Sequence, residues 1–291
     1  MKRTARKISR TGGVELLRKT ASTMEIARTR VSAGAILFDE NEVPNSYGVM
    51  ALEQTAGRGQ RGRAWFSKPG ESLSVTYFVR HGLADEKYLG HLSLMVGVAV
   101  ARLLHDNALF CLEKTNADRV YKGVTEYLET PEIFKEPAPF RLKWPNDILL
   151  NGKKIAGILI ERMEAPDGKP VFLIGVGVNV KNRKFPEELQ SIATSLSLEG
   201  VPTDCLNLQI WAEKLAELIA EEADICARTE GKSTLTRWRM RNDTWGRTYV
   251  AATETGEITG VAKGISEEGA LILELPDGSK MSVSSATANI S

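Results

Sequence analysis

The feature that most constrains the fold is a short apolar run that leads directly into a loop dense in glycine and arginine. Residues 47–53 carry the apolar side chains of a buried strand. The loop after it contains three glycines, three arginines and a closing tryptophan: Gly57, Gly59, Gly62, Arg58, Arg61, Arg63 and Trp65. Glycine lets the backbone approach a ligand closely, and the planar guanidinium group fits phosphate and carboxylate oxygens. The stretch therefore predicts an anion-binding loop at the end of a strand.

Two nucleotide-binding motifs share the glycine spacing of this loop, and neither fits the residues around it. The dinucleotide fingerprint needs a helix directly after the glycines and an acidic residue about 20 positions further on. Residues 66–70 end in Pro-Gly, which does not continue a helix, and Arg80 follows them. A P-loop needs Lys followed by Ser or Thr, where this chain has Arg63 and Ala64. A solvated basic turn and a nucleic-acid contact stay open here, although a single aromatic residue gives the latter little support.

The composition of the chain excludes several classes of protein. Among 291 residues, 38 basic ones balance 37 acidic ones, so no global charge favours nucleic acid or a membrane. Three widely spaced cysteines, at positions 111, 205 and 226, are typical of a reducing cytoplasm and indicate neither a disulfide framework nor a zinc site. The longest apolar run, residues 171–180, is too short to span a bilayer, and no apolar stretch follows the basic N-terminus as in a secretory signal. We expect a cytoplasmic protein without membrane contact, with a disordered basic tail over residues 1–20.

The first half of the chain predicts helices and strands in alternation. A helix is expected to start at Ser22 or Thr23, with Glu25 in its first turn. Residues 72–79 alternate as a strand does, and residues 89–104 carry apolar side chains at helical spacing. Between residues 109 and 140 the pattern weakens and prolines accumulate, which predicts an insertion, with a short helix at residues 116–128 as one option.

A second dense motif, residues 142–147, reads Leu-Lys-Trp-Pro-Asn-Asp. Two apolar runs joined by Asn151-Gly152 follow it and predict a β-hairpin, with Lys154 and Gly157 on the returning strand. Residues 171–180 predict a third strand that contains two glycines and Asn179, a side-chain amide that needs a partner if it is buried. A glycine inside a strand often marks the close approach of a ligand.

The last third of the chain changes from helices to short strands. Residues 206–228 and 233–241 predict two helices. Strands are expected at 247–252, 257–266, 270–275 and 280–283, a spacing typical of a small antiparallel barrel. We therefore expect an α+β protein with a larger domain at residues 21–243, interrupted by the insertion, and a barrel at residues 244–291.

Together the motifs favour the joining of a carboxylate to a nucleotide phosphate. The arginine loop, Lys143 and Lys154 supply cations, and Trp65 and the glycine-containing strand at residues 171–180 supply an apolar wall. Asn146 and Asp147 are oxygen ligands of the kind that hold Mg²⁺ directly or through water. Activation of a carboxyl group by ATP needs neutralised phosphate charge and a carboxylate held in line with the α-phosphorus.

At this point the sequence resembles the biotin protein ligases, also called biotin–[acetyl-CoA-carboxylase] ligases. The matching stretches occur in family order: Ser22-Thr23, residues 54–65, 143–147, 154–161, 175–179 and the terminal barrel. The resemblance implies a catalytic domain related to class II aminoacyl-tRNA synthetases, with a mixed sheet flanked by helices, followed by an SH3-like domain. It also implies two steps, in which biotin and MgATP give biotinyl-5′-AMP and a lysine of a biotin carboxyl carrier domain then takes the biotin.

The resemblance assigns roles to individual residues. It implies biotin contacts by Ser22, Thr23, Met24, Gln54, Gly57, Arg58, Gly59, Gln60, Trp65, Lys154 and Gly157. It implies nucleotide contacts by Arg58, Arg61, Arg63, Lys143, Asn146, Asp147 and Asn179. Lys154, Arg58 and Lys143 would be catalytic, and Asp147 would hold Mg²⁺, directly or through water. ATP and biotin would be substrates, and no tightly bound prosthetic group is expected.

The sequence departs from the family pattern at three positions, and other functions compete with this one. Ala21 and Met24 replace the outer residues of the first motif, and Gln60 replaces an arginine of many members. Only about 20 residues precede Ser22, too few for a DNA-binding domain, so a ligase without specific DNA binding is expected. A monomer and a homodimer both remain open. A lipoate or octanoate ligase is the alternative within the superfamily, and a nucleic-acid-binding protein is the alternative outside it.

Overall fold

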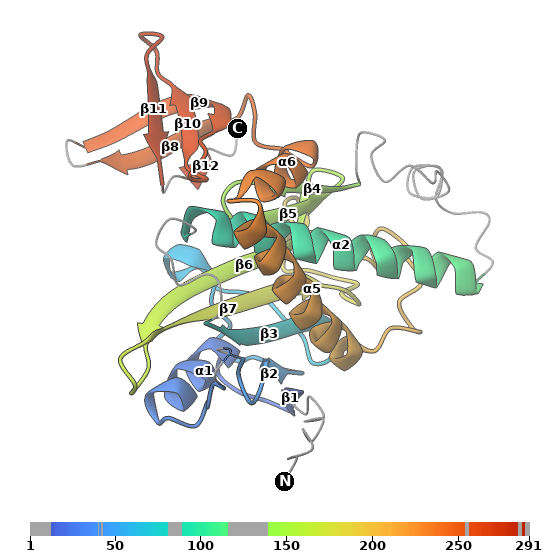
Figure 1. Cartoon of the computed structure of the whole chain (residues 1–291). Helices are drawn as coiled ribbons and strands as arrows, with labels where there is room; N and C mark the ends of the chain where they lie inside the picture. The colour runs from blue at the N-terminus through green and yellow to red at the C-terminus, as the bar shows by residue number, and fades with distance from the viewer. Residues whose placement is uncertain are drawn as a thin grey trace.

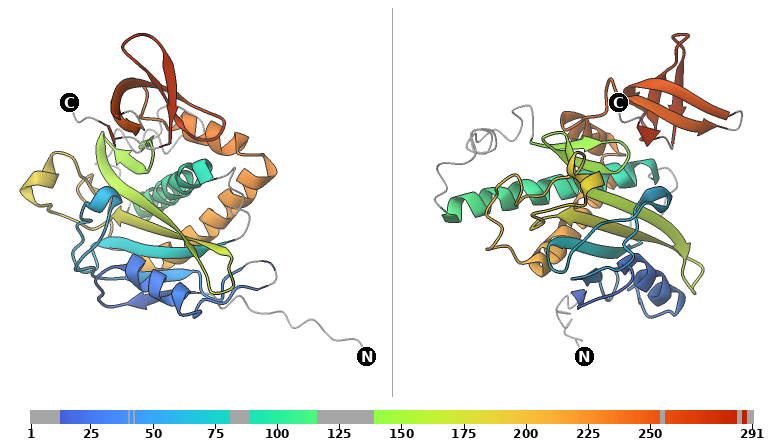
Figure 2. Two further views of the ribbon diagram at one scale, coloured as in Figure 1. Left: turned by 90° about the vertical axis from the view of Figure 1, so that its left-hand side faces the viewer. Right: turned by 180° about the vertical axis from the view of Figure 1, so that it is seen from behind.

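A computed structural model describes residues 13–39, 41, 43–80, 89–115, 139–253, 256–284 and 287–288, with the side chains at positions 61, 109–115, 253 and 287–288 outside that description. A mixed seven-stranded sheet carries helices on its faces, and a five-stranded antiparallel sheet lies beyond the edge formed by β4 (Figures 1 and 2). The α+β architecture expected from the sequence is confirmed. Within the described residues, no helix is both long and apolar enough to cross a membrane.

The large sheet has the strand order β1-β2-β3-β7-β6-β5-β4. Its strands are β1 (Val14–Leu17), β2 (Gly48–Ala51), β3 (Ser72–Val79), β4 (Phe140–Lys143), β5 (Asp147–Leu150), β6 (Lys153–Glu164) and β7 (Pro170–Asn179). Only β1 and β2 are parallel, and every other neighbouring pair in this sheet is antiparallel. The predicted hairpin is confirmed, since Asn151 and Gly152 both have positive φ between β5 and β6, as a tight two-residue turn requires.

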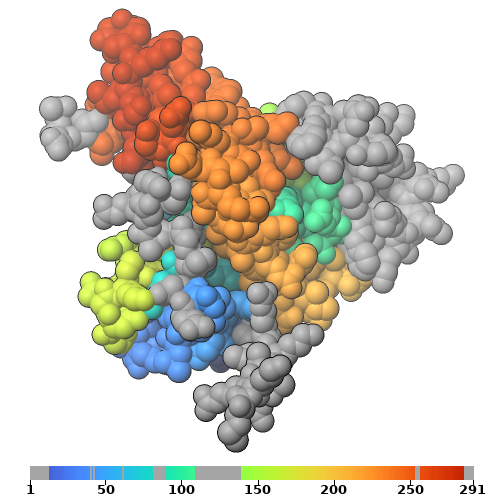
Figure 3. Space-filling view, viewed as in Figure 1, coloured from blue at the N-terminus to red at the C-terminus, as the bar shows by residue number. Residues whose placement is uncertain are grey.

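Helices cover both faces of this sheet. The helix α1 (Thr23–Ser32) packs on one face, where its buried residues meet Val49, Phe78 and Leu173. The helices α2 (Leu89–Thr115), α5 (Leu208–Arg228) and α6 (Lys232–Met240) lie on the opposite face, where α5 and α6 form much of the surface seen in Figure 3. Two short helices, η1 (Gln60–Gly62) and α4 (Glu187–Gln190), interrupt the connections.

The structure corrects two expectations about the N-terminal half. Part of the predicted disordered tail is ordered, because Val14–Leu17 forms β1 and pairs with β2. Four residues are too few to show an alternating pattern, so the partner strand, which the sequence pattern does not reveal, decides this segment. The helix expected at 89–104 continues to Thr115, into the predicted insertion, since no Pro or Gly occurs between Leu104 and Thr115. The option of a helix at 116–128 lies outside the described residues.

The small sheet has the order β11-β10-β9-β8-β12 and is antiparallel throughout. Its strands are β8 (Thr248–Thr253), β9 (Gly256–Ile265), β10 (Leu271–Glu274), β11 (Lys280–Val283) and β12 (Thr287–Ala288). The four longer strands were expected from the sequence, and β12 was not. Buried side chains of alternating residues, among them Tyr249, Ala251 and Leu271, form its core.

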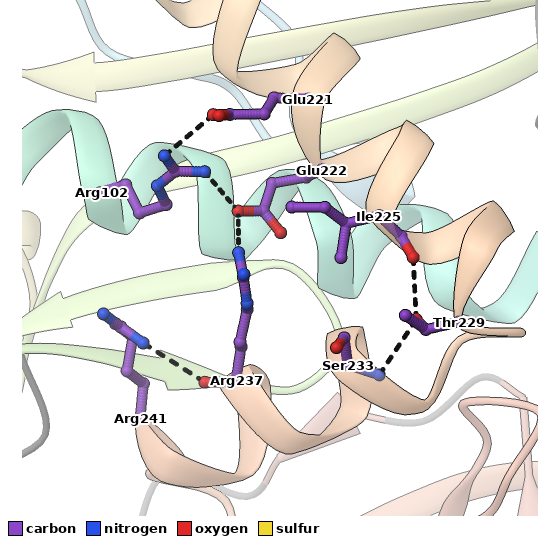
Figure 4. Close-up of polar contacts among 8 residues, drawn as sticks. All are labelled: Arg102, Glu221, Glu222, Ile225, Thr229, Ser233, Arg237 and Arg241. Atoms are coloured by element: carbon purple, nitrogen blue, oxygen red, sulfur yellow. Dashed lines mark hydrogen bonds and ion pairs between the residues drawn. The ribbon is translucent and has the colours of Figure 1, made fainter.

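A buried carboxylate joins the three helices on the outer face of the large sheet. Glu222 of α5 has no exposed surface and accepts hydrogen bonds from Arg102 of α2, at 2.5 Å, and from Arg237 of α6, at 2.7 Å (Figure 4). Arg102 also pairs with Glu221 at 2.9 Å. This network connects α6, which leads into the small sheet, to the helices that cover the large one.

Candidate active site

A cavity opens on the face of the large sheet that carries α1, next to the first residues of that helix. Strands β3, β6 and β7 form its floor, and the glycine-arginine loop forms one wall. Many of the residues singled out by sequence line it: Ser22, Thr23, Met24, Gln54, Arg58, Gly59, Gln60, Trp65, Asn146, Lys154 and Gly157. The structure thus brings together parts of four motifs that are far apart in the chain.

The end of the cavity nearest α1 is a chain of polar contacts. The side-chain oxygen of Gln54 accepts hydrogen bonds from the backbone N–H of Thr23, at 2.7 Å, and from the Thr23 hydroxyl, at 3.1 Å. The hydroxyl of Thr76 on β3 donates to the Thr23 hydroxyl at 2.9 Å. Ser22 occupies the cap position of α1 but makes no side-chain capping bond. These contacts fix the orientation of the Gln54 amide, which is what recognition of a small polar ring requires.

The glycine-arginine loop folds back on itself as a narrow hairpin. The backbone of Gly59 donates to Arg63 O at 2.7 Å, and that of Trp65 donates to Gly57 O at 2.9 Å. A Cβ atom at Gly57 would lie 2.7 Å from the carbonyl oxygen of Trp65, so only glycine fits there. One turn of 3₁₀ helix closes the hairpin, and no helix follows, so the loop is not a dinucleotide fingerprint. Arg63 is exposed and does not line the cavity, and the side chain of Arg61 lies outside the described residues.

Three glycines form a flat floor under Trp65 and Met24. Gly157 of β6 and Gly177 of β7 are direct partners in the sheet, and Gly175 lies two residues before Gly177 on the same face. A Cβ atom at Gly177 would lie 2.4 Å from Cε2 of Trp65, and one at Gly175 would lie 2.9 Å from Cε of Met24. The absence of side chains therefore lets the indole and the thioether lie directly against the backbone. The indole Nε1 is buried and has no hydrogen-bond partner among the described residues.

A β-bulge directs Lys154 into the cavity. In the β5–β6 pair, Leu149 lies opposite Lys154 while Ile148 lies opposite Ala156, so Ile155 is an extra residue on β6. A bulge changes the side to which the neighbouring side chain points, which places Lys154 on the same face as Gly157. Its Nζ pairs with Asp147 Oδ1 at 2.6 Å and lies 5.8 Å from the centroid of the Trp65 ring.

The turn between β4 and β5 places the remaining polar residues at the edge of the cavity. Asn146 donates from Nδ2 to Ile158 O at 2.6 Å and lines the cavity. Lys143 and Asp147 are partners in the β4–β5 pair and do not line it, although Asp147 reaches it through Lys154. Burial lowers the pKa of Lys143, and the nearby Asp147 carboxylate opposes that shift.

Asn179, predicted near the nucleotide, is buried at the end of β7 and does not line the cavity. Its Nδ2 donates to Thr194 O at 3.0 Å, while its Oδ1 is buried and has no hydrogen-bond partner among the described residues. It lies two residues beyond Gly177, on the same face of the sheet. Since a buried acceptor of this kind is uncommon, the position is compatible with a ligand contact next to the glycine floor.

Seven residues that line the cavity were not named individually as site residues from the sequence: Val75, Thr76, Ile158, Leu159, Gly175, Val176 and Gly177. A signal was present for some of them. The alternation of Ser72, Ser74 and Thr76 puts a polar stripe on one face of an apolar strand, and the two glycines of β7 mark close approach. The apolar residues carry no signal that separates them from the core.

An α+β core, a small antiparallel sheet and a cavity that combines cations, amides and a glycine floor are what the sequence analysis expects of a ligase that activates carboxylates. Residues 26–180 match the model of the biotin/lipoate A/B protein ligase family, and residues 249–288 match that of the biotin protein ligase C terminal domain. The chain therefore belongs to the biotin protein ligases of this family.

Individual relatives agree with this assignment. The chain is 31% identical over 263 residues to the biotin–[acetyl-CoA-carboxylase] ligase of Mycobacterium tuberculosis, covering 90% of this chain and 83% of that protein. It is 30% identical over 251 residues to the bifunctional ligase/repressor BirA of Bacillus subtilis, covering 82% of this chain but only 65% of that longer protein.

Solved structures support the fold independently. The biotin protein ligase of Aquifex aeolicus, in complex with biotin and ATP, superposes with a TM-score of 0.67 at 23% identity, covering 96% of this chain and 99% of that chain. The biotin protein ligase of Leishmania major, in complex with biotin, superposes with a TM-score of 0.54 at 26% identity, covering 94% and 98% of the two chains.

Proposed function

We propose that this chain is an ATP-dependent biotin protein ligase, which makes biotinyl-5′-AMP and transfers the biotin to a lysine of a biotin carboxyl carrier domain. One observation supports this most directly. The Thr76–Thr23–Gln54 chain and the Lys154 ammonium group line the same cavity, whose floor of glycines lies under Trp65. Such a cavity suits a ligand with a polar ring, an apolar middle and a carboxylate.

In the first step, a carboxylate oxygen of biotin attacks the α-phosphorus of ATP, and the bond to the bridging oxygen breaks to release pyrophosphate. Ser22, Thr23 and Gln54 hold the ureido ring, and Met24 and Trp65 enclose the apolar part. Lys154 neutralises the charge that develops on the carboxyl and phosphate oxygens, with Arg58 beside it and Lys143 at the phosphate end. Their contribution is to position the two reactants and to stabilise charge.

In the second step, an amine of the carrier lysine attacks the acyl carbon of the mixed anhydride. The amide bond forms, AMP leaves with the electrons of the broken C–O bond, and the nitrogen loses a proton. Gly57, Gly59, Gln60 and Arg58, Arg61 and Arg63 belong to the loop that would close over the adenylate, and Gly157 and Asn179 would contact it. A closed loop keeps water from hydrolysing the anhydride before the carrier arrives.

The residues at the turn between β4 and β5 fit a magnesium ion. Mg²⁺ in nucleotide sites is usually held by one or two carboxylates together with phosphate oxygens and water. Asp147 offers a partly exposed carboxylate at the edge of the cavity, and Asn146 offers its Oδ1, because its Nδ2 is used by Ile158 O. When bound, the ion would neutralise triphosphate charge, and Asp147 would hold it directly or through water.

The partner and the setting of this reaction are part of the proposal. The acceptor would be the biotin carrier domain of a biotin-dependent carboxylase, in keeping with the names of the relatives. A cytoplasmic location, a lack of specific DNA binding and a monomeric or homodimeric state stay predictions from the sequence. Domain limits at residues 21–243 and 244–291 belong to the same set of predictions.

Exchange of radiolabelled pyrophosphate into ATP, with biotin, lipoate or octanoate added singly, tests the proposal. We expect exchange with biotin alone. Exchange supported only by lipoate or octanoate would refute biotin as the substrate and indicate a lipoate or octanoate ligase. The absence of exchange with all three acids would refute carboxylate adenylation.

A matched pair of lysine variants tests the role of Lys154. Lys154→Gln should reduce biotin-dependent exchange about 100-fold or more, in line with the loss of one charge-stabilising donor. Lys153→Gln is the control, because Lys153 donates to Gln190 O at 3.0 Å and does not line the cavity. Equal activity of the two variants would contradict the assignment of Lys154.

A further inference from the structure

The turn of residues 143–147 decides where two proposed phosphate-end residues point. Lys143 and Asp147 form the last pair of the β4–β5 ladder, and Trp144 to Asn146 connect them. Asn146 is held from the large sheet, through its bond to Ile158 O, and Pro145 O accepts a hydrogen bond from Ser93 of α2 at 2.8 Å. The second half of the turn is thus fixed by the catalytic core itself.

The first half of the turn is held by residues that follow α6. The backbone N–H of Trp144 donates to Thr244 Oγ1 at 2.8 Å, and its indole Nε1 donates to Gly269 O at 3.2 Å. The hydroxyl of Tyr249 donates to Trp144 O at 3.2 Å. All three of these contacts are buried. Both polar groups of the Trp144 backbone and its only side-chain donor are therefore satisfied by the small sheet and the segment that leads to it.

Ring packing and burial accompany these hydrogen bonds. The rings of Trp144 and Tyr249 meet edge to face, with centroids 6.2 Å apart and an interplanar angle of 75°. Thr244 and Tyr249 have no exposed surface, and Trp144 is only 4% exposed. Burial raises the pKa of Tyr249 to about 12, so its hydroxyl keeps its proton, and remains a donor, at any pH at which the protein works.

Backbone pairing extends the contact to β4. The N–H of Leu142 donates to Arg241 O at 2.7 Å, and the N–H of Asp243 donates to Leu142 O at 2.8 Å. The segment that connects α6 to the small sheet therefore runs beside β4 and forms one isolated parallel bridge with it, between Asn242 and Leu142. It ends at Thr244, which makes the first of the three bonds to Trp144.

We propose that Thr244 and Tyr249 are positioning residues for nucleotide use: through Trp144 they hold the turn that carries Lys143 and Asp147. The proposal rests on the proposed ligase function. Asp147 lies within 2.6 Å of Lys154, so a shift of the turn changes the arrangement of charges at the phosphate end of the cavity. The polar end at Thr23 and Gln54 has no contact with this turn among the hydrogen bonds of the described residues, so a shift of the turn would leave the contacts to the ureido ring in place.

Tyr249→Phe and Thr244→Val test this, because each removes a hydroxyl while keeping the shape of the side chain. The matched control is Tyr77→Phe, which removes another buried tyrosine hydroxyl, the donor to Ala212 O at 2.8 Å on the opposite side of the sheet. KM for MgATP and kcat are measured by biotin-dependent pyrophosphate exchange, biotin Kd by calorimetry, and stability by urea unfolding.

We expect both positioning variants to lose about five- to tenfold in kcat/KM for MgATP, the effect of one lost buried hydrogen bond on the geometry of the turn. Their biotin Kd should stay within about twofold of wild type. Tyr77→Phe should lose similar stability while its kinetic constants stay unchanged. Kinetic losses that match those of Tyr77→Phe, or an equal loss of biotin affinity, would overturn the positioning role.

Amide hydrogen exchange of residues 146–148, without substrate, separates this proposal from the ligase function. If the turn is held by Tyr249 and Thr244, both variants should exchange faster there than wild type, and Tyr77→Phe should not. Unchanged exchange at the turn would refute the positioning role even in an active ligase. Absence of pyrophosphate exchange in the wild type would instead refute the proposed function, and with it the link to nucleotide.

Discussion

Replacing Gly177 with alanine tests whether the glycine floor sets the position of Trp65. The added Cβ would lie 2.4 Å from Cε2 and 2.6 Å from Cζ2 of the indole. Non-bonded carbon atoms pack at about 3.5–4.0 Å, so the ring must move away from the sheet by about 1 Å or more. The ring carbons belong to a rigid indole, so no rotation of a flexible end relieves the contact.

The size of the effect follows from what the displaced ring touches. Overpacking of this kind costs about 1–3 kcal/mol, and a displacement of about 1 Å beside reacting groups can cost up to about 100-fold in rate. Lys154 Nζ lies 5.8 Å from the centroid of this ring, so a movement of the ring changes the surroundings of the proposed catalytic lysine. We expect kcat/KM for ATP to fall about 10- to 100-fold, which corresponds to about 1.4–2.7 kcal/mol.

The assay is biotin-dependent pyrophosphate exchange, measured beside urea unfolding. Gly264→Ala is the matched control, because it is also a glycine of a strand, and an added Cβ there would lie 3.6 Å from Ile272 Cδ1, an ordinary contact. The control should keep its exchange rate. If Gly177→Ala also keeps its rate within about twofold, Trp65 does not depend on the floor and the reasoning fails.

Two further predictions concern stability. Glu222→Gln should lower the free energy of unfolding by about 2 kcal/mol, which is less than the usual cost of breaking a buried ion pair because Arg102 and Arg237 are partly exposed. The control Glu221→Gln changes an exposed carboxylate and should lower the free energy of unfolding by less than about 0.5 kcal/mol. Equal urea midpoints for the two variants would contradict this prediction. Burial lowers the pKa of His105 in the folded protein. Between that lowered pKa and about 6.5, the unfolded protein binds more protons at this residue than the folded protein does, so the free energy of unfolding falls as the pH drops through this window. His105→Asn should flatten that part of the curve in urea titrations between pH 7.5 and 5, and an unchanged slope would show that other groups cause it.

Local sequence signals predicted much of the fold. The turn chemistry of Asn151-Gly152 defined the β5–β6 hairpin, and residues 72–79 alternate clearly enough to give the bounds of β3. The edge strands β1 and β12 could not be found in this way, because segments of four and two residues carry no period and depend on a partner strand. The end of α2 was misplaced because a weaker apolar pattern after Leu104 concealed a continuous helical segment.

Cavity residues that belong to sequence motifs could be predicted, whereas the direction in which a side chain points could not. Thr23, Gln54 and Trp65 were expected from their motifs, and the structure brings them together. The direction of Lys154 depends on the extra residue Ile155, which becomes visible only when the register of two strands is known. Arg63 was expected at the nucleotide and lies outside the cavity, because the hairpin directs only part of its arginines inward. Its role at the nucleotide stays a proposal.

The pairing order of the large sheet also has a consequence for how the protein folds. Strand β7 lies between β3 and β6, and its Asn179 pairs with Ser72 of β3, which is 107 positions earlier (179 − 72), so we expect this non-local pairing to form late in folding. During synthesis, Thr23, Gln54 and Trp65 leave the ribosome well before Gly177 provides the surface on which the indole rests. Biotin would therefore find no site on a nascent or partly folded chain, and the vitamin would stabilise the finished enzyme without assisting its maturation.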